Sequence, residues 1–352
     1  GETKEVNASG ISITEQIEAA YQTNCMKDVL ETVTPSKLQE ILSQGDWMDL
    51  TPEQLKEALA NAGADESAIE NEYYKEQVQS LEACAGASQE VYDMLEQYDI
   101  PNTVQNVMAA DLYLKDRNQG LRKLFGSYEN TDGVDQSDLE AIKEDILERF
   151  GEAVKTPKEM AEAQETLAEV AEHALENMVK IDDNISTIDL KAMQLVNAQM
   201  SIFTAKAKEE NYAIPVLING ELTNVELKIV RGTKKKGMVD VLMDIDRMGK
   251  VAAKFQAKEE GISGLVVSDN EDTRNLLADH MGLLASTIQE NGAEAVDVRC
   301  AIVPDLDLNR FAKENESTTN VDEQETDDSY EIQTARLYNI AESFISLIKE
   351  IS

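Results

Sequence analysis

Glycine and proline are scarce in this sequence of 352 residues, with 17 and 6 copies respectively. This is about half of their average usage in globular proteins. Because both residues interrupt helices, the scarcity favours long helices and argues against folds that hold nucleotides in glycine-rich loops. The chain also has one tryptophan and 5% aromatic residues. We therefore expect no stacking platform for bases or sugars and no small-molecule substrate.

Positive charge is also in short supply. The chain has 32 basic and 69 acidic side chains, which gives a formal net charge of −37. Proteins that bind nucleic acid gain affinity by placing Lys and Arg on phosphates, so this balance predicts no nucleic acid partner and disfavours anionic membrane surfaces. The sequence has no run of about 18 apolar residues, and we expect no membrane insertion.

The three cysteines, Cys25, Cys84 and Cys300, lie far apart and form no CxxC motif. They predict small apolar side chains in a reducing compartment, without a disulfide framework or a zinc site. The first residues lack the pattern of a signal peptide, which predicts a cytoplasmic protein. A first residue Gly1 in place of Met suggests a segment of a longer chain.

Residues 1–210 are predicted to form a helical domain, with helix after helix from about residue 11. Threonine followed by proline marks three helix starts, at Thr34, Thr51 and Thr156, and Gln54 and Glu159 complete capping boxes at the second and third. One apolar stripe steps by three and four residues. It favours one face of a helical bundle, with a coiled-coil seam as the alternative. Its members are Met160, Ala163, Leu167, Val170, Ala174, Met178 and Ile181.

Residues 211–312 are predicted to form an α+β domain, because the apolar period becomes two from Ile214 to Val303. Polar residues alternate with the apolar ones, which predicts a mixed or antiparallel sheet covered on one side only, by one helix. That helix is expected to start at a capping box of Ser268 and Glu271 and to cover the sheet with Leu277, Met281 and Leu284. Asn219 and Gly220 predict a type I′ hairpin turn.

The end of the chain divides in two. Residues 313–330 are acidic and polar, which predicts a flexible linker. Residues 331–352 predict an amphipathic helix that docks on this protein or on another. Its apolar side carries Ile332, Ile340, Phe344, Leu347, Ile348 and Ile351.

Residues with the pattern of a catalytic or metal site are lacking. The two histidines, His173 and His280, both fall on predicted helices, where an ion-paired and a packing role are the simpler interpretations. The segments 243–249 and 130–135 lack the ligand spacing of a calcium loop. We therefore expect no catalytic residue, no metal, no cofactor and no enzyme activity. An enzyme built on paired carboxylates is the alternative.

Residues 239–303 resemble the C-terminal domain of flagellar hook-length control proteins. That family has a strand, a Leu-Gly turn, two further strands, an acidic Asn-rich helix start, a Leu-rich helix and a Val-rich strand. The matching residues here are Val241–Ile245, Met248-Gly249-Lys250-Val251, Ala252–Ala257, Gly264–Ser268, Asn270–Leu277 with Leu283-Leu284, Gln289–Gly292 and Val296-Asp297-Val298. Met248 replaces the usual Leu, and Ile245 stands where the family commonly has Pro.

The resemblance implies a bacterial protein that ends hook growth by binding. It would be exported through the flagellar type III apparatus, engage the cytoplasmic domain of the export gate, and switch the gate from hook to filament substrates. Hook and hook-cap proteins are further implied partners. The family's N-terminal region is Pro/Gln-rich, whereas this one is helical, so a role as a molecular ruler requires it to unfold during export. The alternative is an acidic intracellular scaffold or adaptor without a flagellar role.

Three groups of residues are candidates for partner binding. The first is the basic loop Arg231, Lys234, Lys235 and Lys236, which either meets an acidic partner or is a solvated turn that blunts a sheet edge. The second is the turn with Met248, Gly249 and Val251. The third is the apolar side of the last helix, with Phe344, Leu347 and Ile348.

Overall fold

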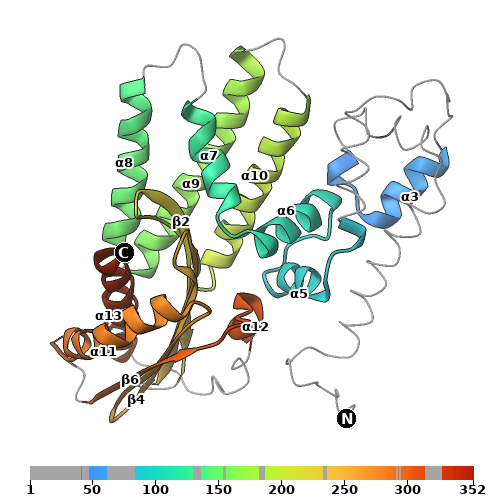
Figure 1. Ribbon diagram of the computed structural model, residues 1–352. Coiled ribbons are helices and arrows are strands. Elements are labelled where there is room, and N and C mark those ends of the chain that lie inside the picture. The colour runs from blue at the N-terminus through green and yellow to red at the C-terminus, as the bar shows by residue number, and fades with distance from the viewer. Residues whose placement is uncertain are drawn as a thin grey trace, which may run out of the picture. The chain divides into compact units, whose positions relative to one another are not determined.

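Figure 1 shows the computed structural model, which describes residues 41, 47–61, 84–129, 136–153, 156–181, 187–232, 236–290, 292, 295–313 and 327–352. The chain divides into two compact units. One comprises residues 1–116 with 171–205, and the other comprises 117–170 with 206–352. This division differs from the predicted boundary at residue 210, because residues 117–170 belong with the sheet.

The first unit is helical in its described residues, as predicted. It contains a 3₁₀ turn, η1 (Trp47–Asp49), and the helices α3 (Pro52–Asn61), α5 (Gln89–Gln97) and α6 (Val104–Lys115). The second part of the long helix α9 (Pro157–Ile181), from residue 171 on, and all but the last two residues of α10 (Thr187–Ala207) complete it. The rings of Tyr113 and Phe203 meet in a T-shaped arrangement with centroids 5.0 Å apart, so α6 packs against α10.

The predicted helix starts can be compared with the structure at two places. Thr51 and Gln54 form the expected reciprocal capping box, with hydrogen bonds of 3.0 and 3.3 Å. At the start of α9 the hydroxyl of Thr156 accepts from the N–H of Glu159 at 3.2 Å. The predicted stripe of α9 is buried at Met160, Ala163, Leu167 and Ala174. Thr34 lies outside the described residues, as do the side chains of Met178 and Ile181.

The second unit is built on a six-stranded mixed sheet with the strands in sequence order. The strands β1 to β5 form an antiparallel meander, and β6 returns parallel to β5 after the helix α11 (Glu271–Glu290). The strands are β1 (Asn211–Ile218), β2 (Glu221–Arg231), β3 (Gly237–Ile245), β4 (Gly249–Lys258), β5 (Gly261–Ser268) and β6 (Val296–Ile302). The predicted α+β class and mixed sheet are confirmed.

One face of the sheet, which we call the first face, carries Val241 and Phe255 and forms the main apolar core. Two helices cover it instead of the one predicted: α11 over β5 and β6, and the C-terminal helix α13 (Asp327–Ile351) over β1 to β3. The rings of Phe255 and Phe344 meet with centroids 5.6 Å apart. The predicted amphipathic helix therefore docks on its own chain.

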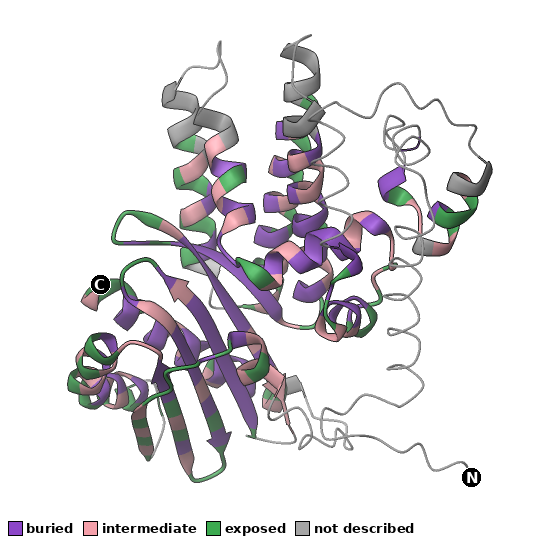
Figure 2. Ribbon diagram, turned by 45° about the vertical axis from the view of Figure 1, so that its right-hand side comes forward, coloured by how far each residue is buried: buried purple, intermediate pink, exposed green. Residues whose placement is uncertain are grey.

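The opposite, second face carries Glu226 and Asp240, and its coverage corrects the prediction that one side of the sheet is bare. Both carboxylates are nearly inaccessible, at 7% and 3% exposure. The short helix α12 (Leu308–Lys313) lies against β3 and β4, and α7 (Gln119–Glu129) lies against β2. The sheet and α12 pack together through a small apolar cluster, which consists of Leu242, Ala252, Val267, Leu306 and Leu308. Exposed residues remain on the outer strands (Figure 2).

The start of α11 differs from its prediction, whereas the turn between β1 and β2 agrees with its prediction. The cap of α11 is Asn270, whose Oδ1 accepts from the N–H of Thr273 at 3.0 Å, so the predicted box of Ser268 and Glu271 is wrong. Ser268 is the last residue of β5, and its hydroxyl accepts from the N–H of Asn270 at 3.1 Å. The turn at Asn219 and Gly220 has φ of 54° and 78°, as a type I′ turn requires.

The predicted linker between the last two elements is shorter than expected. The helix α12 includes Lys313, and α13 begins at Asp327, so both ends of the segment 313–330 are helical. The remaining residues of that segment lie outside the described ones. The helix α8 (Gln136–Ala153) and the first part of α9, up to Val170, complete the second unit, and α8 packs against β1.

Candidate functional site

The apolar residues predicted to bind a partner are part of the protein core. Phe344, Leu347 and Ile348 of α13 are 0 to 5% exposed beneath the first face of the sheet. Val251 is fully buried, and Met248 is 8% exposed. A partner therefore reaches Phe344, Leu347 and Ile348 only if α13 leaves the sheet, whereas Val251 lies inside β4 and Met248 lies in the turn beside the start of α11.

Polar contacts fix the N-terminal half of α13 to the ends of the strands. Gln333 donates from Nε2 to the carbonyl of Gly232 at 3.0 Å, and Arg336 donates from Nη2 to the carbonyl of Lys258 at 2.6 Å. The hydroxyl of Tyr338 donates to Oε1 of Glu210 at 3.0 Å and lies 2.6 Å from the hydroxyl of Tyr212. Burial and the Glu210 carboxylate raise the pKa of Tyr338, so the hydroxyl stays protonated.

The basic loop is only partly free to meet a partner. Arg231 forms a bidentate ion pair with Glu210, with both N–O distances 2.6 Å, and its guanidinium lies 4.2 Å from the centre of the Tyr330 ring. Lys236 is exposed. Lys234 and Lys235 lie outside the described residues, so their proposed contact with an acidic partner stays a prediction.

The turn between β3 and β4 is the site at which the start of α11 is held. Gly249 has a φ of +81°, and its neighbour Lys250 donates its N–H to Oδ1 of Asp269 at 2.9 Å. A Cβ atom at Gly249 would lie 2.4 Å from that same oxygen. The hydroxyl of Thr273 donates to the carbonyl of Met248 at 2.7 Å. Two hydrogen bonds thus connect the turn with the start of α11.

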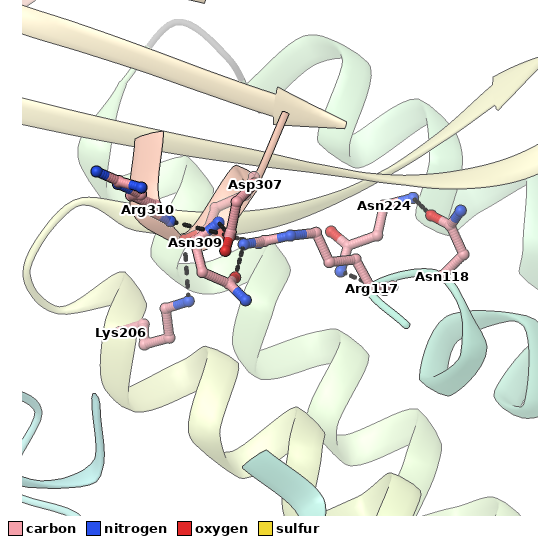
Figure 3. Close-up of polar contacts among 8 residues, drawn as sticks. Arg117, Asn118, Lys206, Asn224, Asp307, Asn309 and Arg310 are labelled. Atoms are coloured by element: carbon pink, nitrogen blue, oxygen red, sulfur yellow. Dashed lines mark hydrogen bonds and ion pairs between the residues drawn. The ribbon is translucent and has the colours of Figure 1, made fainter. Parts of the chain in front are cut away.

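A cluster of buried charges on the second face was not predicted (Figure 3). Two cations, Arg117 and Lys206, share the carboxylate of Glu226, with a Lys206 Nζ to Oε1 distance of 3.2 Å. Arg117 also donates to the side chain of Asn309 in α12. Burial lowers the pKa of Lys206, and the Arg117 charge adds to this, while Glu226 opposes it.

Two further groups extend this charged cluster along the sheet. Asn118 accepts at Oδ1 from the N–H of Asn224 at 2.8 Å, and Asn224 donates to the carbonyl of Arg117 at 2.9 Å. Lys254 lies 3.2 Å from a carboxylate oxygen of Asp240 and covers the Phe311 ring at 5.4 Å. Burial raises the pKa of Asp240. The cluster fixes residues 117–118 and α12 to the sheet.

The cluster was missed because its members on the strands alternate with apolar residues. That pattern is normally produced by a solvent-exposed face. One feature of the sequence could have indicated the cluster. Oppositely charged residues stand at positions that face each other across β3 and β4, such as Asp240 and Lys254. Arg117 and Lys206 come from outside the strands, and no sequence spacing links them to Glu226.

A pocket of about 180 Å³ lies beside β1 in the second unit. It is bounded by α8, β1 and α13, and its walls are mainly apolar, with the charged groups of Glu342 and Lys349 at the side of α13. The apolar lining is Leu147, Phe150, Ile214, Pro215, Val216, Leu217 and Ile345.

The remaining residues singled out in the sequence have structural contacts. Cys84 is buried, and burial raises its pKa to about 12, whereas Cys300 donates to the carbonyl of Arg274 at 3.5 Å. Cys25 lies outside the described residues. His173 is 4.0 Å from Glu176, and Nδ1 of His280 lies 2.7 Å from the carbonyl oxygen of Leu276.

Within the described ranges, no group of three or more metal-ligating side chains comes together. No helix of the described residues combines the length and the apolar character that crossing a membrane requires. In comparisons with known proteins, no protein-family model, no curated protein and no solved structure matches this chain significantly.

Proposed function

We propose that residues 239–303 form a binding module of the hook-length control type. The module would engage the cytoplasmic domain of the flagellar export gate and change its substrates from hook to filament proteins. The work is done by binding, without a covalent step. The observation that carries this proposal is the turn at Gly249, which fixes the start of α11 through Asp269 and Thr273.

This turn supports the proposal because it accounts for the residue types of the resemblance. The family has glycine in the turn and an acidic, Asn-rich start of the following helix. Here Gly249 takes a φ that other residues rarely adopt, Asp269 accepts from the turn, and Asn270 caps α11. The elements β3, β4, β5, α11 and β6 also follow in the order that the resemblance implies.

The partner is expected to contact the outer surface of α11. Its residues at helical spacing are exposed and largely polar or acidic, with one apolar member, Leu283, that is 51% exposed. The opposite side of α11, with Leu277 and Leu284, is buried against the sheet. We define the outer surface of α11 as Asn275, Asp279, Leu283, Ser286 and Glu290.

Direct binding to the soluble domain of the export gate tests this proposal. The full chain is immobilised, and the gate domain from the same bacterium is passed over it in biolayer interferometry. We expect binding that Leu283→Glu weakens at least about tenfold, because an apolar contact is replaced by a charge. Ile332→Glu on α13 is the matched control, since Ile332 is 58% exposed and lies outside the module.

The outcomes separate the proposal from its alternative. A wild-type chain that does not bind the gate domain would contradict the proposal and leave the acidic scaffold or adaptor as the better description. Equal weakening by Leu283→Glu and Ile332→Glu would show that α11 does not carry the contact.

A further inference from the structure

The two edges of the six-stranded sheet differ in how well they are protected. At the β1 edge the side chain of Gln164, which is 1% exposed, forms hydrogen bonds with backbone groups that a neighbouring strand would otherwise bind. Its Oε1 accepts from the N–H of Ala213 at 3.1 Å, and its Nε2 donates to the carbonyl of Ala213 at 3.3 Å. Two residues on, Pro215 has no N–H to offer. Both features block pairing with another strand.

The β6 edge has no such protection among the described residues. Ile262 donates its N–H to the carbonyl of Ala295, and Val303 donates to the carbonyl of Ser268. In a parallel pair this means that the odd-numbered residues of β6 face β5 and the even-numbered ones face away. The outward N–H and C=O groups belong to Val296, Val298, Cys300 and Ile302. Among the described residues, these N–H groups have no acceptor and these C=O groups have no donor.

The side chains of β6 are complementary to a second, antiparallel copy of the same strand. Asp297 and Arg299 project from the second face, where they lie 3.4 Å apart as an ion pair within the strand, and their side chains are 68% and 79% exposed. A two-fold axis at Val298 places Asp297 directly opposite the partner's Arg299, and Arg299 opposite the partner's Asp297. Opposite charges at such facing positions stabilise a strand pair.

We propose that two copies of this chain pair through β6 and extend the sheet across a two-fold axis at Val298. Val298 faces the partner's Val298 in a hydrogen-bonded pair, and Val296 faces the partner's Cys300. The outward backbone groups of these residues then donate and accept across the axis, as a two-fold interface requires. This inference concerns self-association and is independent of the proposed gate binding.

The net charge of −37 per chain sets the conditions under which the dimer forms. Two such chains repel each other at long range, and salt screens this repulsion over about 8 Å at physiological ionic strength. Asp297 and the partner's Arg299 lie closer together than this distance, so salt screens their attraction less than it screens the long-range repulsion. We therefore expect the dimer to be weak and to form more readily at about 0.15 M salt than at low salt.

Sedimentation velocity of the full chain at increasing concentration tests the proposal. We expect a shift from monomer to dimer by about 100 µM. Asp297→Arg and Arg299→Asp each place like charges opposite one another twice, and each is expected to weaken the dimer about tenfold. The double variant restores the two attractive pairs and should recover dimerisation. A wild-type chain that stays monomeric, or a double variant that dimerises no better than the single variants, overturns the proposal.

Proline substitution tests the backbone pairing independently of charge. Val298→Pro removes one outward N–H from β6, and Leu217→Pro removes one from the protected β1 edge, which makes it the matched control. Circular dichroism verifies that both variants keep the fold. We expect only Val298→Pro to abolish the dimer. Unchanged dimerisation of Val298→Pro, or an equal loss in Leu217→Pro, contradicts pairing through β6.

Discussion

Gly249 shows how one residue connects the sequence pattern with the structure. Its positive φ and its close approach to Asp269 leave no room for a side chain. The sequence predicted a turn here, with Gly249 as a member of it. It did not predict the contact with Asp269, because that residue is 20 positions away and its hydrogen bonding depends on how β5 and α11 join.

Gly249→Ala is expected to destabilise the protein by about 1–3 kcal/mol, because alanine at positive φ is strained and its Cβ would displace Asp269. Chemical denaturation followed by circular dichroism measures the change. The matched control is Gly282→Ala, since Gly282 lies inside α11 and a Cβ there meets nothing within 4 Å. That variant should be more stable by about 0.5–1 kcal/mol. A Gly249→Ala variant with an unchanged free energy of unfolding would refute the assigned role of the turn.

Glu226 is the second residue whose role can be tested alone. Removing its carboxylate leaves the cations of Arg117 and Lys206 buried without their shared counter-charge. Glu226→Gln is therefore expected to lower the free energy of unfolding by about 3–5 kcal/mol. Glu221→Gln, at an exposed position of the same strand, should change it by less than about 0.5 kcal/mol. Equal effects of the two variants would mean that the buried cluster does not stabilise the fold.

At the scale of elements, the long periodic segments were predictable and the short or polar ones were not. The apolar stripe of α13 predicted a helix that docks, but not its site, because a stripe does not specify which surface it covers. The six residues of α12 are too few to show a helical period. The polar alternation on β2 to β4 indicated solvent exposure, whereas Asp240 is buried there and is paired with the partly buried Lys254.

The docking of α13 makes a prediction about its central aromatic residue. Phe344 is fully buried and contacts the Phe255 ring. Phe344→Ala should destabilise the second unit by about 3–5 kcal/mol, through lost burial and the cavity left behind. Thermal unfolding measures this, with Ile332→Ala on the exposed side of the same helix as the control. If α13 binds a partner instead of the sheet, the two substitutions will have similarly small effects.

At the scale of the whole molecule, the chain joins a helical unit to a unit built on a mixed sheet, and the two are interleaved in sequence. The apolar period of two from Ile214 onward predicted where the sheet begins, close to the start of β1 at Asn211. It could not predict that residues 117–170 join the sheet, because the helical period of α7 and α8 does not specify which surface they cover. The contacts of Arg117, Asn118 and Gln164 with the strands are made by isolated polar side chains. Isolated polar contacts of this kind produce no periodic pattern in a sequence.

The length of hooks on cells that lack this chain tests its proposed role most directly. Electron microscopy of purified hooks from the deletion strain measures it, with the wild-type chain restored from a plasmid as the control. We expect overlong hooks without filaments in the deletion strain, and rescue by the wild-type chain but not by Leu283→Glu. Hooks of normal length that carry filaments in the deletion strain would contradict the proposed role.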